Sequence, residues 1–488
     1  MNIPTAVKNI IDKLTEAGYE AYIVGGCVRD LLMDKMPGDW DVTTNAKPEE
    51  IQKLFPDSFY ENEFGTVGVK TESEDETLKV VEVTTYRTES AYSDKRHPDE
   101  VKFAATLDED LKRRDFTMNA IAMGSDPSDA TRYTLHDPFE GQKDIERRLI
   151  RAVEDPEERF SEDALRMMRA IRFSSTLGFV IEEHTLEEIK AHAHHIKHIS
   201  AERIRDEFMK LIGGDHAQAA IELMRETGLL EDIVPELIEG IGVEQNLHHI
   251  YTVWEHNLRS LGYTAQQHYS LEIRLAALLH DVGKPKSKRG EGRNGTFYGH
   301  EVIGARMTAR LLERLKFPRE MADKITKLVR YHMFYYLPDE VTESSVRRLV
   351  ANIGKENVED LLKVREADRI GSGTPKAIPY KLRHLKFMID KVARDPISPK
   401  MLKVNGNDIM QLLAIPPGPK VGMIMNALME EVLEDPAKNT KEYLESRSHE
   451  LSAMSNEQLS RLSQQGKDKT KELENEEIEQ IKKKHYVS

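Results

Sequence analysis

Two aspartates, Asp39 and Asp41, stand two residues apart just after the turn residues Pro37-Gly38. If the chain from Asp39 to Val42 is a β-strand, both side chains point the same way, because side chains alternate between the faces of a strand. Two carboxylates that close repel each other unless a cation lies between them, and Mg²⁺ suits carboxylate, phosphate and water oxygens. The pair therefore predicts a Mg²⁺ site, and the alternative is an acidic loop that faces solvent.

A glycine pair lies upstream of these aspartates. An apolar run that ends at Val24 meets Gly25 and Gly26, and a short helical pattern that carries Arg29 follows. Glycines let backbone N–H groups come close to a phosphate, and the start of a helix favours an anion. A phosphate-binding turn beside paired carboxylates indicates transfer of a nucleotide. Glu82, in a later predicted strand, is either a third metal ligand or an outward-facing residue.

A polar stripe follows in the next helical region, which runs from Pro156 to about residue 235. We expect Ser161 to cap the helix that carries the stripe. Its members recur every third residue: Asp163, Arg166, Arg169 and Arg172. Side chains at that spacing touch, so the stripe is either a set of surface ion pairs or an arrangement of acceptor and donors that imitates the pairing edge of a base. The second alternative would select a nucleotide without a nucleic-acid template.

A second group of potential ligands lies between residues 241 and 375. His280 and Asp281 directly follow the apolar run 275–279, which places two polar side chains at the rim of a core. A lone histidine there is more often a satisfied core residue. Four further potential ligands lie in the same region: His256, His300, His332 and Asp368.

The elements that position these residues divide into two kinds. In the first 150 residues, helical and strand patterns alternate; helices are expected over 4–18 and 48–54, and strands over 67–70 and 78–84. The polar and aromatic stretch 86–101 has no period and predicts a mobile loop. A helix is expected to open at Leu111, with Arg114 and Asp115 near its start. Helical patterns dominate from residue 156 onward, and the charged end (469–484) is either a solvated helix or disorder.

Composition limits the classes of partner. The net charge of −15 argues against nonspecific coating of nucleic acid, so no DNA partner is expected, but it leaves room for an RNA held on a local basic strip. No apolar run is long enough for a membrane span, and the N-terminus lacks the form of a signal peptide. The single cysteine, Cys27, fits a reducing, cytoplasmic environment.

Five motifs, in this order, resemble those of class II tRNA nucleotidyltransferases, the bacterial CCA-adding enzymes. They are Gly25-Gly26-x-Val28-Arg29-Asp30, Asp39-x-Asp41, the stretch with Arg87, Asp94 and Arg96-His97-Pro98, Arg113-Arg114-Asp115-Phe116, and Glu162-Asp163-x-x-Arg166. The resemblance implies an α+β fold, with a small mixed α/β nucleotidyltransferase head (1–152) and a mostly α-helical neck (153–240). An HD-type helical domain (241–375) and a helical, tRNA-contacting C-terminal region with a charged tail (376–488) would follow.

The resemblance also implies roles for single residues. Asp39 and Asp41 would bind Mg²⁺ and be catalytic. Nucleotide would be bound by Gly25, Gly26, Arg29 and Arg114. Asp163 and Arg166 would read the base of CTP or ATP, and Arg169 and Arg172 would support that pocket.

The implied function is template-independent addition of C, C and A to tRNA 3′ ends. A partial activity (CC-adding, A-adding or poly(A) addition), a phosphohydrolase acting on RNA ends and a noncatalytic RNA-binding protein are the alternatives. Arg87, Asp94 and Arg96 in the stretch 86–101 weigh against a CC-only enzyme, and the intact aspartate pair weighs against a hydrolase alone.

The His-Asp group resembles the HD metal-dependent phosphohydrolases. That resemblance implies that His256, His280, Asp281 and Asp368 bind one divalent metal, which the sequence does not identify among Mn, Fe, Ni and Mg. His300 and His332 would either add a second ion or bind a phosphate. The sequence leaves open whether this site is active, because a decayed site would retain the same helical pattern.

Overall fold

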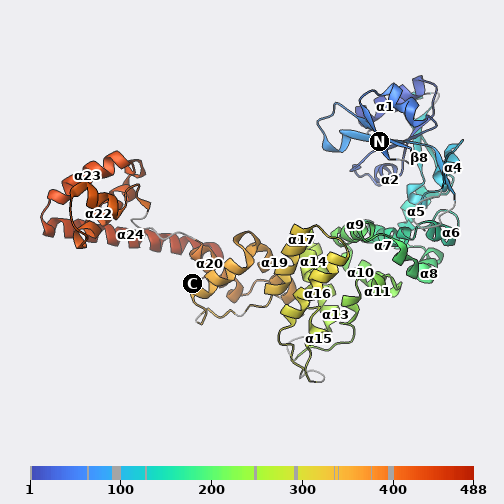
Figure 1. The fold of residues 1–488 in the computed structure, drawn as a ribbon. Helices are drawn as coiled ribbons and strands as arrows, with labels where there is room; N and C mark the ends of the chain where they lie inside the picture. Colours follow the sequence, from blue (N-terminus) through green and yellow to red (C-terminus); the bar gives the residue numbers. More distant parts are fainter. Residues whose placement is uncertain are drawn as a thin grey trace. The chain divides into compact units, whose positions relative to one another are not determined.

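The computed structural model describes residues 3–62, 65–90, 100–126, 129–246, 250–290, 295–334, 336–338, 340–374, 376–393 and 401–487. The chain forms two compact units: Met1–Met333 with Glu359–Pro375, and Phe334–Val358 with Lys376–Ser488. Figure 1 follows the chain from the N-terminal sheet into the long series of helices. The α+β class with a mixed head and a helical remainder is confirmed, whereas the bounds of the four predicted domains stay predictions.

In the part of the chain that the structure describes, the head is built on a seven-stranded sheet in the order β3-β4-β5-β2-β1-β8-β9. Strands β2 and β5 are parallel, and the other neighbours are antiparallel. The strands are β1 (Ala21–Val24), β2 (Asp41–Thr44), β3 (Ser58–Asn62), β4 (Thr66–Lys70), β5 (Val80–Thr85), β8 (Ala122–Asp126) and β9 (Asp129–His136). The central position of β1 and β2 places both predicted motifs at the middle of the sheet.

Short helices pack around this sheet. Helix α1 buries Val7, Ile10, Ile11 and Leu14, whose spacing of three and four residues forms one apolar stripe. The remaining helical segments are α2 (Gly26–Leu32), α3 (Pro48–Leu54), the 3₁₀ turn η1 (Glu76–Leu78), α4 (Leu107–Lys112), the 3₁₀ turn η2 (Thr117–Asn119) and α5 (Gly141–Arg147), with α1 spanning Thr5–Glu16. Val24, Tyr86, Leu111 and Val153 belong to one buried cluster that joins strand β1 to helix α4.

Two expectations about strands need correction. Strand β2 begins at Asp41, so Asp39 precedes it and the alternation of a strand does not align the two aspartates. The stretch 86–101 is not a plain loop, because β6 (Arg87–Ser90) and β7 (Glu100–Phe103) pair as an antiparallel ribbon. The motif residues Asp94, Arg96, His97 and Pro98 lie outside the described residues.

Two helices begin elsewhere than expected. Helix α4 ends at Lys112, so Arg114 and Asp115 follow a helix instead of opening one. Asp155 accepts a hydrogen bond from the Glu157 N–H, and Pro156 stands at the first position, so α6 (Pro156–Glu162) starts early and contains Ser161. Helix α7 then starts afresh at Leu165, which leaves Asp163 between two helices.

The neck and the following region are helical. The segments are α7 (Leu165–Leu177), α8 (Glu183–His192), the 3₁₀ segment η3 (Ala193–His198), α9 (Ala201–Gly213), α10 (Ala217–Glu226), α11 (Leu229–Ile233), α12 (Pro235–Ile238), α13 (Val253–Gln266), α14 (Leu271–Leu279), α15 (Lys284–Ser287), α16 (His300–Arg314), α17 (Arg319–Tyr331) and α19 (Val358–Gly371). The short strands β10 (Leu149–Ile150) and β11 (Val180–Ile181) pair in parallel where the head meets the neck. Buried Arg274 of α14 donates to the carbonyls of Gly213 and Gly214, which end α9.

The second unit contains α18 (Glu343–Ile353), the 3₁₀ turn η5 (Lys355–Asn357), α20 (Tyr380–Val392), α21 (Gly406–Leu413), α22 (Pro419–Glu434), the 3₁₀ turn η7 (Pro436–Lys438), α23 (Lys441–Ala453) and α24 (Asn456–His485). Its core gathers apolar residues of α21 to α24, among them Ile409, Ile424, Leu444 and Leu459. Helix α24 extends to His485, so the charged C-terminal end is helical. Among the described helices, none is both long and apolar enough to cross a membrane.

Candidate active site and a second candidate metal centre

The carboxylates of the head meet across two strands. Asp41 is the first residue of β2, and its partner in the parallel ladder with β5 is Glu82. Residues in register on neighbouring strands present their side chains on the same face of the sheet, so Glu82 lies beside Asp41. Asp41 is half-buried and Glu82 is exposed. Like charges placed side by side are unfavourable, and this pairing favours the metal-ligand interpretation of Glu82 over that of a plain surface residue.

Asp39 joins this acidic group from the preceding turn. Burial raises the pKa of the Cys27 thiol to about 12, and the negative charges of Asp41 and Asp39 contribute to that shift. Both carboxylates therefore lie near Cys27, whose Sγ is 3.8 Å from the carbonyl oxygen of Asp41. The three carboxylates do not form a group of converging ligand atoms among the described residues, so the binding of Mg²⁺ by Asp39 and Asp41 stays a prediction.

Gly25 lies close to both the Asp41 carboxylate and the Arg114 guanidinium. Its φ of +82° favours glycine, and a Cβ at this position would lie 3.0 Å from Arg114 Nη1 and 3.7 Å from Asp41 Oδ2. Arg114 Nη2 donates to Asp110 Oδ2 at 3.3 Å, and its buried Nε makes no hydrogen bond among the described residues. Arg114 Nη1 therefore lies beside the glycine turn, and the binding of nucleotide by Arg114 stays a prediction.

Arg29 is differently placed. Its buried guanidinium donates to Asp30 Oδ1 through Nε and Nη2, at 2.9 and 2.7 Å, and to Asn119 Oδ1 through Nη1 at 2.9 Å. It also lies 5.2 Å from the centre of the Phe173 ring. These contacts tie α2 to the segment after Arg114 and to the neck, so Arg29 orients the glycine turn as well as adding positive charge behind it.

A buried polar network continues into the neck. Asn119 Nδ2 donates to Asp115 Oδ1 at 3.2 Å, and Arg169 Nε donates to Asp115 Oδ2 at 2.8 Å. Arg172 Nε donates to Glu207 Oε2 at 3.0 Å, and Arg169 Nη1 lies 3.7 Å from Glu207 Oε1. Burial alone would raise the pKa of Asp115, but Arg169 and the hydrogen bonds lower it to about 2. Arg169 and Arg172 thus contact Asp115 and Glu207, and their support of the base-reading residues stays a prediction.

The side chains of Asp163 and Arg166 do not pair with each other in the contacts that the structure describes, although the Arg166 N–H donates to the Asp163 carbonyl at 3.0 Å. Asp163 Oδ2 accepts from Arg203 Nη2 at 2.7 Å, and Asp163 Oδ1 accepts from the Leu165 N–H at 3.1 Å. Arg166 instead pairs with Glu162 and donates through Nη2 to the carbonyl of Arg113 at 2.9 Å. Sequence reasoning missed Arg203, and no local pattern could have found it, because it lies on α9.

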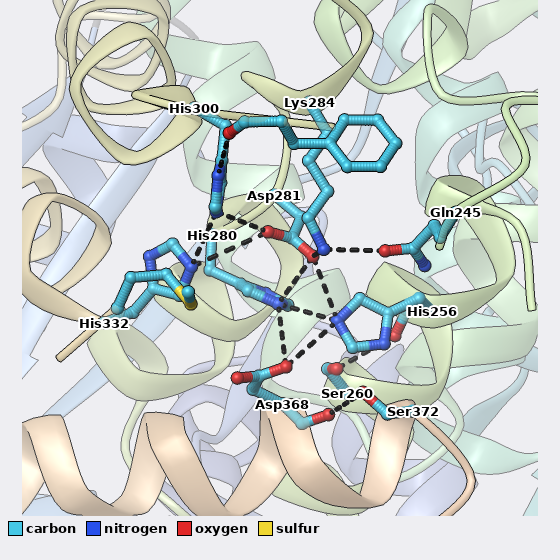
Figure 2. A network of polar contacts seen from close by, with 12 residues as sticks. Gln245, His256, Ser260, His280, Asp281, Lys284, His300, His332, Asp368 and Ser372 are labelled. Carbon is cyan, nitrogen blue, oxygen red and sulfur yellow. Dashed lines mark hydrogen bonds and ion pairs between the residues drawn. The ribbon is translucent and has the colours of Figure 1, made fainter. Parts of the chain in front are cut away.

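The His-Asp group converges at the end of α14. Seven consecutive buried residues of α14 (273–279) anchor the helix and place His280 and Asp281 in the core. Figure 2 shows that the predicted ligands His256, His280, Asp281 and Asp368, together with His300 and His332, gather around the Asp281 carboxylate. All six residues are buried.

The two oxygens of Asp281 face different partners. Oδ2 lies 3.1 Å from His256 Nε2 and 3.3 Å from His280 Nε2. Oδ1 lies 3.2 Å from His300 Nε2 and 3.6 Å from His332 Nε2. Asp368 Oδ1 completes the first set at 3.3 Å from His256 Nε2. Among the described residues, two groups of three have ligand atoms close enough together to hold a metal ion: His256, His280 and Asp368, and His280, Asp281 and His332.

Hydrogen bonds at the outer ring nitrogens fix the orientation of three of these histidines. His280, His300 and His332 place Nδ1 at 2.7–2.8 Å from the carbonyl three residues earlier. A carbonyl only accepts, so Nδ1 carries the proton and Nε2 points its lone pair inward, as metal ligands do. His256 Nε2 is only 2.8 Å from His280 Nε2, and such a pair needs a proton or a cation between them. With no cation between them, the negative charge of Asp281 raises the pKa of His280 to about 10 although burial opposes it, so a proton on Nε2 and a bound ion are alternatives at this position.

A cavity of about 560 Å³ opens beside the cluster. It is lined by Lys284, Arg365 and Arg369 together with Asp281, His300 and Asp368. Lys284 Nζ lies 2.5 Å from Asp281 Oδ2 and donates to Gln245 Oε1 at 2.6 Å. Positive side chains around a metal-ligand set suit an anionic ligand.

A mixed sheet that presents paired carboxylates beside a glycine turn, followed by a helical neck with buried arginines, defines a nucleotidyltransferase. Residues 21–151 match the family of the poly A polymerase head domain, residues 178–240 match the family described as "Probable RNA and SrmB- binding site of polymerase A", and residues 303–447 match a tRNA nucleotidyltransferase domain 2 family. The CCA-adding enzyme of Geobacillus stearothermophilus is 34% identical over 89% of this chain and 93% of its own length. The chain belongs to the family of CCA-adding tRNA nucleotidyltransferases.

Two further comparisons agree with this assignment. The CCA-adding enzyme of Lactobacillus helveticus (strain DPC 4571) is 48% identical over 46% of this chain, and the match spans about half (54%) of that protein's length. The crystal structure of the Bacillus stearothermophilus CCA-adding enzyme in complex with CTP is similar over 92% of this chain and 98% of its own, with a TM-score of 0.56 and 31% identity. The recognised family and the expected fold are therefore confirmed.

The Asp115–Arg169 ion pair makes the free energy of unfolding depend on pH in the acidic range. The pKa of about 2 in the folded chain lies below the ordinary value of about 3.9, so the pair stabilises the fold above pH ~4 and this contribution is lost as the pH falls toward ~2. We expect Asp115→Asn to lower the free energy of unfolding at pH 7 by roughly 1–4 kcal/mol and to flatten its decline below pH 4. Urea unfolding at several pH values measures both effects; an acid dependence identical to that of the unchanged protein would contradict the assignment.

Proposed function

We propose that this chain adds C, C and A to the 3′ end of tRNA from CTP and ATP without a template. The observation that carries the proposal is the pairing of Asp41 with Glu82 beside the Gly25 turn and Arg114. Membership in the CCA-adding family supports tRNA, CTP and ATP as the partners. The cytoplasmic location expected from the single cysteine stays a prediction.

The residues of the head divide the work of nucleotidyl transfer. Mg²⁺ held by Asp39 and Asp41 would polarise the reacting phosphate and favour the attacking 3′-oxygen. The backbone at Gly25 and Gly26 lets the triphosphate approach closely, and Arg114 neutralises its charge. Arg29 holds α2 in place, so that the phosphate and the carboxylates keep their relative positions.

Base selection follows from the chemistry of Asp163 and Arg166. Cytosine and adenine both present an exocyclic amino donor, whereas guanine and uracil carry a carbonyl acceptor at the corresponding position. A carboxylate accepts from the amino group and repels the carbonyl, so Asp163 favours CTP and ATP over UTP and GTP. The Asp163–Arg203 and Arg166–Glu162 pairs hold both side chains at the end of the neck nearest the head.

The products made from staged tRNAs separate the full activity from its partial versions. We expect a tRNA that ends at the discriminator base, at C or at CC to be extended to CCA in each case, with C added twice and A once. Sequencing the product ends with each nucleotide alone and with both measures this. Products that stop at CC, or that begin only from CC, would assign a CC-adding or an A-adding enzyme instead.

Removing an active-site carboxylate separates chemistry from RNA binding. We expect Asp39→Ala and Asp41→Ala each to lower incorporation by at least about 10³-fold, because the metal ligand is lost, while the Kd for tRNA changes little. Asp57→Ala serves as the matched control, since this exposed aspartate pairs only with Lys70 among the described contacts. Incorporation that survives in either variant would refute the metal assignment.

The His-Asp cluster supports a second candidate function, that of a metal-dependent phosphohydrolase. The orientation of three histidines by backbone carbonyls and the placement of Asp281 between two sets of ligands support one or two divalent ions there. A bound ion would activate water and polarise a phosphate ester. At His300 and His332, both Nε2 atoms face Asp281 Oδ1. This arrangement favours a second ion over a bound phosphate, because a carboxylate would repel the phosphate. The identity of the metal stays open.

Replacing Asp281 tests whether the two sites are independent. We expect Asp281→Asn to lose the ions bound at the cluster and any phosphatase activity, while CCA addition stays within about two-fold, because distant sites usually act additively. Metal content after dialysis and CCA addition to tRNA are the measurements, with the exposed Asp215→Asn as the control. Unchanged metal content would contradict the assignment of a metal centre to this cluster. Loss of both activities would show that the cluster supports the fold of the whole protein.

A further inference from the structure

Arg203 contacts the residue that the proposed function assigns to base reading. It lies on α9, and its guanidinium places Nη2 2.7 Å from Asp163 Oδ2 and Nη1 3.4 Å from Asp163 Oδ1. The Asp163 side chain is largely buried, whereas that of Arg203 is about one-third exposed. The contact is therefore bidentate, which is the arrangement in which arginine fixes the orientation of a carboxylate most firmly. It is also only partly exposed to water.

The Asp163 backbone is held by hydrogen bonds, from its own N–H to the Arg159 carbonyl at 3.3 Å and from the Arg166 N–H to its carbonyl at 3.0 Å, so what Arg203 adds is the orientation of the carboxylate. Asp163 lies between the end of α6 and the start of α7, outside both helices. Its one other described side-chain contact is the hydrogen bond from the Leu165 N–H to Oδ1. Without Arg203, the carboxylate could rotate about its side-chain bonds while Leu165 held a single oxygen.

The arrangement leaves a defined acceptor for the base. Oδ1 receives the Leu165 N–H and the longer Arg203 contact, and Oδ2 receives the short one. A carboxylate oxygen has two lone pairs, so Oδ2 retains one of fixed direction. A single fixed acceptor distinguishes an amino group from a carbonyl, which is the difference between CTP or ATP and UTP or GTP.

We propose that Arg203 is a specificity-positioning residue, which fixes the Asp163 carboxylate so that the enzyme accepts nucleotides with an exocyclic amino group and rejects those with a carbonyl. This inference rests on the proposed reading of the base by Asp163. Arg203 acts through Asp163 and needs no contact of its own with the nucleotide. Glu162 has the matching role for Arg166, to which it is paired.

Arg203→Gln and Arg203→Lys test the inference in the full-length protein. The ratio of kcat/KM for CTP to that for UTP, on tRNA ending at the discriminator base, should fall on the order of ten-fold in Arg203→Gln. It should fall less in Arg203→Lys, which keeps the charge but loses the bidentate contact. Arg205→Gln is the matched control, because Arg205 lies on the same helix and contacts Asp206 and the Lys316 carbonyl instead.

A double variant separates this role from others. If Arg203 acts through Asp163, Asp163→Ala with Arg203→Gln should show the same CTP-to-UTP ratio as Asp163→Ala alone, with an unchanged Kd for tRNA. An additive loss together with weaker tRNA binding would overturn the inference and make Arg203 an RNA contact. An unchanged ratio in the Gln and Lys variants would also overturn it, and the Lys variant decides alone if Arg203→Gln does not fold.

The preference of Asp163→Ala for CTP over UTP shows separately whether the proposed base reading by Asp163 is wrong. If Asp163→Ala itself keeps the original preference for CTP over UTP, Asp163 does not read the base, and the positioning role of Arg203 falls with it. A melting curve for each variant completes the comparison. A purely structural role would lower the melting temperature without changing the nucleotide ratio, and that outcome counts against the inference.

Discussion

Repulsion between carboxylates is the constraint around which the head is built. The parallel pairing of β2 with β5 brings Asp41 beside Glu82, and the turn before β2 brings Asp39 to the same region. Two unit charges about 4 Å apart repel by roughly 1 kcal/mol in water and about 4 kcal/mol near a protein surface. Under the proposed function, a cation and a charged substrate would complete this group.

The neck is joined to the glycine turn of the head by buried polar contacts. A continuous run of buried contacts leads from Arg29 through Asn119, Asp115 and Arg169 to Glu207. Partly satisfied networks are costly and fully satisfied ones are rigid, so this run fixes the distance between the glycine turn and α7. Under the proposed function, metal binding, phosphate binding and base selection would therefore depend on one connected structure, and the His-Asp cluster would use a separate one.

Local patterns in the sequence predicted much of this site. The glycine pair, the short helix α3 and the His-Asp pair at the end of an apolar helix each depend on neighbours within a few residues. Interactions between distant segments were not predictable in the same way. The pairing of Asp41 with Glu82 depends on a parallel register, and the contact of Asp163 with Arg203 joins residues 40 positions apart. The start of α7 was misplaced because Asp155 and Pro156 begin a separate helix earlier than Ser161 could.

Binding of Mn²⁺, as a substitute for Mg²⁺, to the full-length protein tests the central claim most directly. Electron paramagnetic resonance counts the bound ions with and without a non-reactive CTP analogue, in an Asp281→Asn background that removes the second candidate centre. The account predicts that the analogue adds a tightly bound ion, and that Asp39→Asn with Asp41→Asn abolishes this ion. The same nucleotide-dependent binding in the presence and absence of both aspartates would contradict it.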